Sequence, residues 1–174
     1  MKRPVVIAVV GSKSSGKTTT IEALTKELTK RNYKIAVVKH IPELDFTVDT
    51  KGKDTWRFAV SGAKTIISVA PDEIATIEKV KAKGFPLKEI LQKCKGHDIV
   101  FLEGFKKLVG KKKDIYKIAV VRSAKEISEV VKNFEPILAF TGPYSTEKLN
   151  LKIPYVDILK NPEKIVDIVE KVVL

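Results

Sequence analysis

The residues with the clearest chemical purpose lie between positions 11 and 19, where the chain reads Gly-Ser-Lys-Ser-Ser-Gly-Lys-Thr-Thr. Two glycines followed by lysine and threonine at this spacing are typical of a phosphate-binding loop, or P-loop. Its backbone amides and the following helix N-terminus together attract anions. We therefore predict that this segment binds a nucleoside triphosphate. The predicted ligand-binding residues are Gly11, Ser12, Lys13, Ser14, Ser15, Gly16, Lys17, Thr18 and Thr19.

Within this loop the side chains have separate predicted roles. Lys17 would reach the β- and γ-phosphates as a catalytic cation, and the Thr18 hydroxyl would coordinate Mg²⁺. Thr19 would touch the α-phosphate. The alternative is a chance match in a serine-rich turn, which the elements expected on either side disfavour.

A carboxylate at the end of a second apolar run could complete the site. In Asp98-Ile-Val-Phe-Leu-Glu103, four apolar residues precede Glu103, and Gly104 follows at once. This pattern is typical of a Walker B strand, which ends at the sheet edge where ligands bind. We predict that Glu103 holds Mg²⁺ or orients an attacking water. The alternative is an ordinary surface glutamate.

The loop after position 39 carries further polar residues. Asp45 and Asp49 are predicted to contact the water shell of the metal, and Lys53 to meet phosphate charge. A solvated loop whose aspartates cap turns is an equally favoured interpretation. His40 has no cysteine or histidine cluster around it, so zinc is not expected.

The elements that must position these residues follow from the apolar pattern. Strands are expected at 4–10, 34–39, 65–70, 98–102, 117–122 and 136–140, and helices at 17–31, 56–61, 86–95, after Ser123 and after Asn161. Alternating strands and helices predict an α/β fold of three layers, in which helices flank a mostly parallel central sheet. No linker interrupts the pattern, so we predict a single P-loop domain over residues 1–174.

Composition limits the other possibilities. One cysteine among 174 residues excludes a disulfide framework and favours the cytoplasm. No apolar stretch is long enough to span a membrane, and we expect no association with a membrane. The net charge of +12 has two interpretations, a nucleic-acid surface or a solvated lysine-rich surface. We favour the second, because the lysines are spread out, with one dense run from Lys106 to Lys113.

Three segments carry a family resemblance. The first segment is the P-loop. The second runs from Lys39-His40 through Asp45-Phe46 and Gly52-Lys53-Asp54-Thr55 to Ser61-Gly62-Ala63, and the third is the strand ending Leu102-Glu103-Gly104-Phe105-Lys106. In this the chain resembles the family of molybdopterin-guanine dinucleotide biosynthesis protein B (MobB). The middle segment is the distinctive one, because a P-loop alone suits many families.

The resemblance implies a GTP-binding adapter of molybdenum cofactor biosynthesis that hydrolyses GTP slowly at most. It implies GTP and Mg²⁺ as ligands, a homodimer, and a MobA-like nucleotidyltransferase as partner. It also implies that Asp45, Asp49, Thr18 and Glu103 surround the metal and that Lys53 lies near the nucleotide. Guanine preference comes from the resemblance alone, because no Asn-Lys-x-Asp sequence occurs. The Thr141-Gly142-Pro143 turn follows an expected strand, and we predict that it contacts the base.

Two other functions remain as alternatives. A small-molecule P-loop kinase would use Glu103 or Asp45 to position an acceptor hydroxyl, but only four arginines are present for a phosphate-binding lid. A nucleic-acid-binding protein would use the Lys106–Lys113 run, and its affinity would fall steeply with salt.

Overall fold

The computed structural model describes residues 3–80, 86–143 and 151–174. The chain divides into two compact units. The first comprises Met1–His40 and Lys88–Leu174, and the second comprises Ile41–Leu87.

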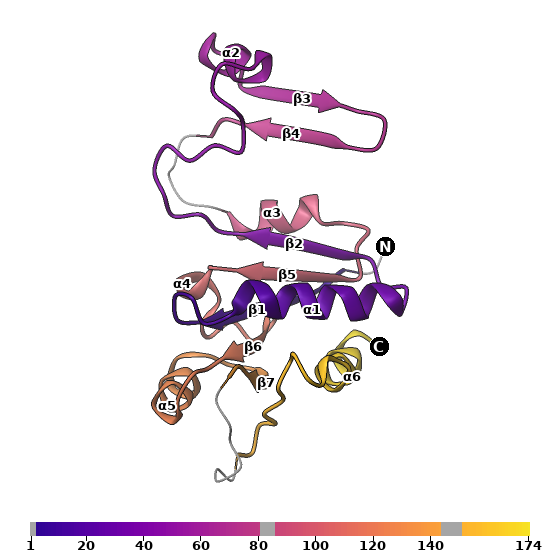
Figure 1. The fold of residues 1–174 in the computed structure, drawn as a ribbon, viewed down its shortest axis with the longest axis vertical. Coiled ribbons are helices and arrows are strands. Elements are labelled where there is room, and N and C mark those ends of the chain that lie inside the picture. The colour runs from indigo at the N-terminus through magenta and orange to yellow at the C-terminus, as the bar shows by residue number, and fades with distance from the viewer. Residues whose placement is uncertain (1–2, 81–85, 144–150) are drawn as a thin grey trace. The chain divides into compact units, whose positions relative to one another are not determined.

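The first unit is built on a five-stranded sheet in which every neighbouring pair is parallel (Figure 1). The strand order is β2-β5-β1-β6-β7. The strands are β1 (Val5–Gly11), β2 (Ile35–Lys39), β5 (Ile99–Glu103), β6 (Tyr116–Val120) and β7 (Ile137–Thr141). The predicted α/β fold with helices flanking a parallel sheet is therefore confirmed.

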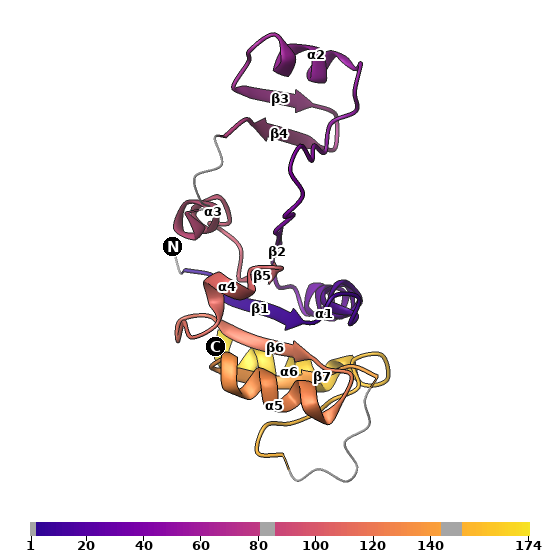
Figure 2. The same ribbon diagram turned by 90° about the vertical axis from the view of Figure 1, so that its left-hand side faces the viewer.

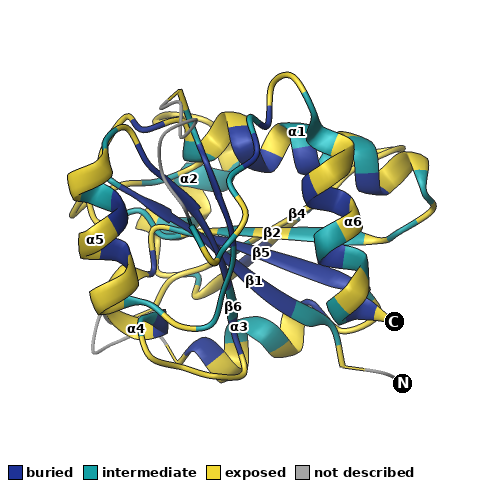
Figure 3. Ribbon diagram, turned by 90° about the horizontal axis from the view of Figure 1, so that it is seen from below, coloured by how far each residue is buried: buried dark blue, intermediate teal, exposed yellow. Residues whose placement is uncertain are grey.

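Helices cover both faces of this sheet. They are α1 (Lys17–Lys30), α3 (Leu87–Lys93), α4 (Lys106–Val109), α5 (Ala124–Asn133) and α6 (Pro162–Val173). Helix α1 lies on one side of the sheet, with α3 and α4 on the other (Figures 2 and 3). Helix α6 packs against α1. None of the described helices is long and apolar enough to cross a membrane.

The apolar run of β1 explains its central place. From Val6 to Val10 every side chain is buried, as a strand covered on both faces requires (Figure 3). On one face the core joins Ile7 and Phe101 of the sheet to Leu24 of α1 and Ile165 of α6. This packing fixes the end of β1 and the start of α1, which carry the P-loop.

The second unit holds α2 (Asp54–Val60) and an antiparallel hairpin of β3 (Thr65–Val69) and β4 (Ile74–Glu78). In the register of the hairpin Ile66 faces Ile77, and Ile66 is buried. The sequence pattern indicated a strand at 65–70, but β4 was not predicted and the hairpin is separate from the parallel sheet. Residues 40–53 form turns and irregular backbone, as predicted.

Candidate nucleotide-binding site

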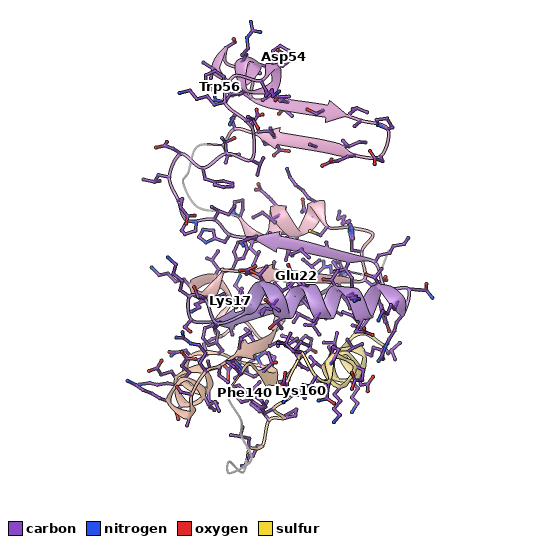
Figure 4. All side chains as sticks on the ribbon, in the orientation of Figure 1. Lys17, Glu22, Asp54, Trp56, Phe140 and Lys160 are labelled. Atoms are coloured by element: carbon purple, nitrogen blue, oxygen red, sulfur yellow. The ribbon has the colours of Figure 1, made fainter. Side chains whose placement is uncertain are left out.

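The P-loop lies where the connections of the sheet diverge. From β1 the chain passes through α1 to β2 on one side, whereas β6 and β7 lie on the other side of β1. Ligands of open α/β sheets bind at such a switch point, beyond the carboxyl ends of the strands. The loop between Gly11 and Lys17 occupies this position, at the N-terminal end of α1 (Figure 4).

Two glycines shape the loop. A β-carbon at Gly11 would lie 2.5 Å from the Val120 carbonyl oxygen and 2.6 Å from Ser15 Oγ, so no larger residue fits. Gly16 has φ of 98°, a left-handed conformation that side chains disfavour. Both positions therefore require glycine for the loop to take this shape.

The first turn of α1 is left open to an anion. Gly16 is the N-cap residue and provides no side-chain acceptor for the free amides of the helix, and the first turn contains no acidic residue. Uncapped amides and the helix dipole both favour a negatively charged ligand. The buried Ser15 hydroxyl also has no hydrogen-bond partner within the described residues. The loop therefore fits a phosphate group.

Lys17 lies folded against the loop, where its Nζ donates a hydrogen bond of 2.6 Å to the Ser12 carbonyl oxygen. Burial lowers the pKa of Lys17, and the positive charges of Lys106, Lys39 and Arg122 lower it further. The negative charge of Glu103 raises this pKa and so opposes them. Three cations thus act on Lys17 against the single carboxylate of Glu103. This concentration of positive charge favours a polyphosphate.

Thr18 and Glu103 meet at the mouth of the loop. Thr18 Oγ1 donates to the Glu103 carboxylate, with distances of 3.1 and 3.2 Å to its two oxygens. Lys39 Nζ lies 3.7 Å from Glu103 Oε1, because Lys39 and Glu103 are register partners on β2 and β5. A hydroxyl beside a single carboxylate suits Mg²⁺, which keeps several waters. No cage of three or more His, Cys, Asp and Glu side chains is present among the residues that the structure describes.

Asp45, Asp49 and Lys53 belong to the second unit, and their proposed contacts with metal and phosphate stay predictions. Locally, Asp49 Oδ1 accepts hydrogen bonds from the Thr50 amide at 2.8 Å and from Thr55 Oγ1 at 2.7 Å. One oxygen of Asp49 therefore stabilises a turn, while its buried Oδ2 has no hydrogen-bond partner in the described part of the chain. Asp45 is exposed, and Lys53 is the N-cap residue of α2.

Sequence reasoning missed a link from the P-loop to α5. The sequence Ser123-Ala-Lys-Glu126 has the pattern of a capping box at the start of α5, and Ser123 Oγ accepts from the Glu126 amide at 3.3 Å. The Glu126 carboxylate, however, accepts from the Arg122 amide at 2.7 Å and from Ser12 Oγ at 3.0 Å. Burial raises the pKa of Glu126, but the hydrogen bonds from Arg122 and Ser12 outweigh it and the pKa lies below its ordinary value. Glu126 thus anchors the P-loop.

Replacing Glu126 by glutamine is expected to loosen Ser12 and to weaken triphosphate binding about fivefold. The lost charge should reduce the free energy of unfolding by about 1 kcal/mol, since the pair is partly exposed. Because the folded-state pKa is lowered, this stabilisation exists at neutral pH and disappears as the pH falls through that lowered pKa. Urea unfolding and nucleotide titration at several pH values measure both effects. The matched control is Glu129→Gln, an exposed position on the same helix; equal losses in both variants would argue against the anchor.

The Thr141-Gly142-Pro143 turn, predicted to contact the base, takes part in structural hydrogen bonds. Thr141 is buried, and its Oγ1 accepts from the Ile158 amide at 3.2 Å. The Tyr155 hydroxyl donates to the Gly142 carbonyl oxygen. A β-carbon at Gly142 would lie 2.2 Å from the Val121 carbonyl oxygen. The turn therefore joins the ends of β6 and β7, and its contact with a base stays a prediction.

Comparisons with known proteins agree on one family. The family model described as "Molybdopterin guanine dinucleotide synthesis protein B" (MobB) matches residues 6–142. A putative molybdopterin-guanine dinucleotide biosynthesis adapter protein of Methanocaldococcus jannaschii is 34% identical over 86% of the chain, and the match spans 60% of that protein. The adapter protein of Haemophilus influenzae is 32% identical over 72% of the chain and 71% of its own length. A crystal structure of a molybdopterin-guanine biosynthesis protein B superposes with a TM-score of 0.73 at 26% identity, covering 97% of this chain and 98% of the other.

Proposed function

Because the chain belongs to the MobB family, we propose that it is a Mg²⁺-dependent GTP-binding adapter in molybdopterin guanine dinucleotide biosynthesis. The observation that carries this proposal is the open first turn of α1, which contains Lys17 and the Thr18 that bonds to Glu103. The two curated relatives are named as adapter proteins of that biosynthesis. We also place the protein in the cytoplasm, on the evidence of its single cysteine.

In this proposal the amides of the loop and Lys17 bind the phosphates. Thr18 and Glu103 would hold Mg²⁺, and the metal would supply positive charge that neutralises the phosphates. Lys39 keeps the Glu103 carboxylate turned toward Thr18. Hydrolysis should be slow at most, well below the ~1–100 s⁻¹ of typical kinases. The partner we propose is a MobA-like nucleotidyltransferase, which would perform the transfer of the nucleotide.

Calorimetric titration with GTP, ATP and their diphosphates, each with and without Mg²⁺, tests the proposal. We expect GTP to bind most tightly, and its affinity to fall when Mg²⁺ is removed. Equal affinities for GTP and ATP would remove the guanine assignment. Rapid transfer of the γ-phosphate to a small acceptor would favour the kinase alternative.

We propose further that the protein forms a homodimer through the hairpin of the second unit. Ile67 and Val69 of β3 and Ile74 of β4 are 60%, 75% and 71% exposed and share one face of the hairpin. A two-stranded hairpin is marginally stable alone, and exposed apolar patches of this kind mark interaction surfaces. A second copy of the same face would bury these side chains.

The double substitution Ile67→Asp and Val69→Asp is expected to convert the dimer to a monomer, because two carboxylates would then be buried at the interface. Sedimentation velocity at micromolar concentration measures the change. Val131→Asp, at a 52% exposed site on α5, is the control and should leave the dimer intact. A parent protein that sediments as a monomer would contradict this assembly.

A further inference from the structure

The two ends of the P-loop contact elements on opposite sides of β1. Thr18, at the end that would hold the metal, donates to Glu103 of β5. Ser12, at the other end, donates to Glu126 of α5 at 3.0 Å, and α5 follows β6. Strands β5 and β6 are the two neighbours of β1 in the sheet (Figure 2). Because Mg²⁺ bridges the β- and γ-phosphates, the nucleoside at the far end of a bound triphosphate would lie on the β6 side.

Arg122 leaves the sheet on this side. It follows the last residue of β6, Val120, by two positions, and Val120 pairs with Gly11 at the start of the P-loop. The amide of the intervening Val121 donates to the Thr141 carbonyl oxygen at 2.8 Å. Arg122 therefore emerges between the P-loop and the turn after β7, on the side where the nucleoside is expected.

The guanidinium of Arg122 is tied to the P-loop through one carboxylate. Its Nη2 and Nε donate to Glu126 Oε1 at 3.0 and 3.3 Å, and the same oxygen accepts from Ser12 Oγ. The Arg122 amide donates to the other oxygen, Oε2, at 2.7 Å. The charge of Arg122 also contributes to lowering the pKa of Lys17, so the guanidinium lies within electrostatic reach of the phosphate site.

The contact with Glu126 leaves part of Arg122 accessible to a ligand. The carboxylate bonds to one edge of the guanidinium, and the Arg122 side chain is 48% exposed. A guanidinium held by its edge can still stack a flat face on an aromatic ring, and its fixed orientation reduces the entropy lost on stacking.

We propose that the guanidinium of Arg122 stacks on the purine base of the bound nucleotide. Glu126 would orient the stacking group and, through Ser12, the P-loop at the same time. A flat cation contacts the face of any purine, so this contact would bind the nucleoside without distinguishing guanine from adenine. The inference rests on the proposed nucleotide binding and deepens it, because it names the residue that holds the base.

Calorimetric titration with GTP, ATP and inorganic tripolyphosphate, each with Mg²⁺, tests this contact, because tripolyphosphate carries three phosphates and no nucleoside. We expect Arg122→Gln and Arg122→Lys to bind GTP and ATP about tenfold more weakly and to bind tripolyphosphate as the parent does. Lysine keeps the charge of Arg122 but has no planar group. The matched control is Lys125→Gln, at an exposed position in the first turn of α5, which should bind all three ligands as the parent does.

Four results would overturn the stacking contact and leave the P-loop assignment intact. An equal loss for GTP and tripolyphosphate would show that Arg122 binds phosphate. A loss for GTP without a loss for ATP would show that it binds the guanine edge. Parent-like binding of GTP by Arg122→Lys would show that charge alone matters. A parent that binds tripolyphosphate as tightly as GTP would show that nothing holds the nucleoside.

Failure of the proposed function has a different signature in the same titrations. A parent that binds none of the three ligands would reject nucleotide binding, and the stacking contact with it. A parent that binds GTP and ATP equally, with the tenfold loss in both Arg122 variants, would remove only the guanine assignment and would support the contact.

Discussion

Lys17→Ala is expected to lower the affinity for Mg²⁺-bound GTP by about 100-fold or more, with the fold intact. The Lys17 ammonium donates to the Ser12 carbonyl oxygen of the loop at 2.6 Å. When a triphosphate binds, the ammonium would exchange this carbonyl for phosphate oxygens. Hydrogen bonds between charged groups contribute about 1.5–3 kcal/mol each, and about 1.4 kcal/mol corresponds to tenfold in affinity.

Calorimetric titration measures the loss, and urea unfolding checks the fold. Lys26→Ala is the matched control, because Lys26 is an exposed lysine farther along the same helix. The control should bind GTP as the parent does. A Lys17→Ala variant that binds GTP with the affinity of the parent would show that the P-loop assignment is wrong, whatever else the protein does.

Lys117→Met is expected to lower the free energy of unfolding by about 3 kcal/mol, because it leaves three carbonyl oxygens without their donor. Methionine replaces the lysine side chain up to Cε and lacks only the terminal ammonium, so the loss reports mainly that group. Burial lowers the pKa of Lys117, whereas Asp114 and Glu135 favour its charged form. Three carbonyl acceptors also favour the protonated lysine.

Urea unfolding at neutral pH measures this loss, with Lys132→Met on the exposed side of α5 as the control. The control should change the free energy of unfolding by less than about 0.5 kcal/mol. Lys117 pairs with Ala8 in the register of β1 and β6, whereas Val120 pairs with Gly11 at the P-loop. Nucleotide affinity of the folded variant should therefore stay near that of the parent. If the unfolding midpoint equals that of the control, the three carbonyl oxygens are hydrogen-bonded to water in the variant and the prediction is wrong.

The parts of the fold that could be predicted are those specified by short stretches of sequence. The P-loop spacing, the apolar run of β1 and the run ending at Glu103 each depend on neighbouring residues, and the structure brings Thr18 and Glu103 into hydrogen-bond contact. The parallel sheet followed from the alternation of strands and helices, except that the strand expected at 65–70 belongs to the separate hairpin.

The parts that could not be predicted depend on partners distant in sequence. Nothing near Lys117 indicates that it is buried, since one of its acceptors is Glu135, 18 residues away. Ser12 and Glu126 are 114 residues apart and meet because β6 pairs with β1. The strand Ile74–Glu78 is short and contains a threonine and a glutamate, so its apolar pattern is weak. The clue to Glu126 was the capping box, which places its carboxylate at the start of α5.

The sheet register has a consequence for synthesis on the ribosome. Strand β1 leaves the ribosome early, but its neighbours in the sheet are Ile99–Glu103 and Tyr116–Val120. Pairing across such long separations is slow to form and leaves strand edges exposed meanwhile. The apolar strand β1 must therefore stay unpaired and exposed to solvent until more than half of the chain has left the ribosome. Chaperone binding to ribosome-bound chains should then be strongest before β6 emerges and decline after it.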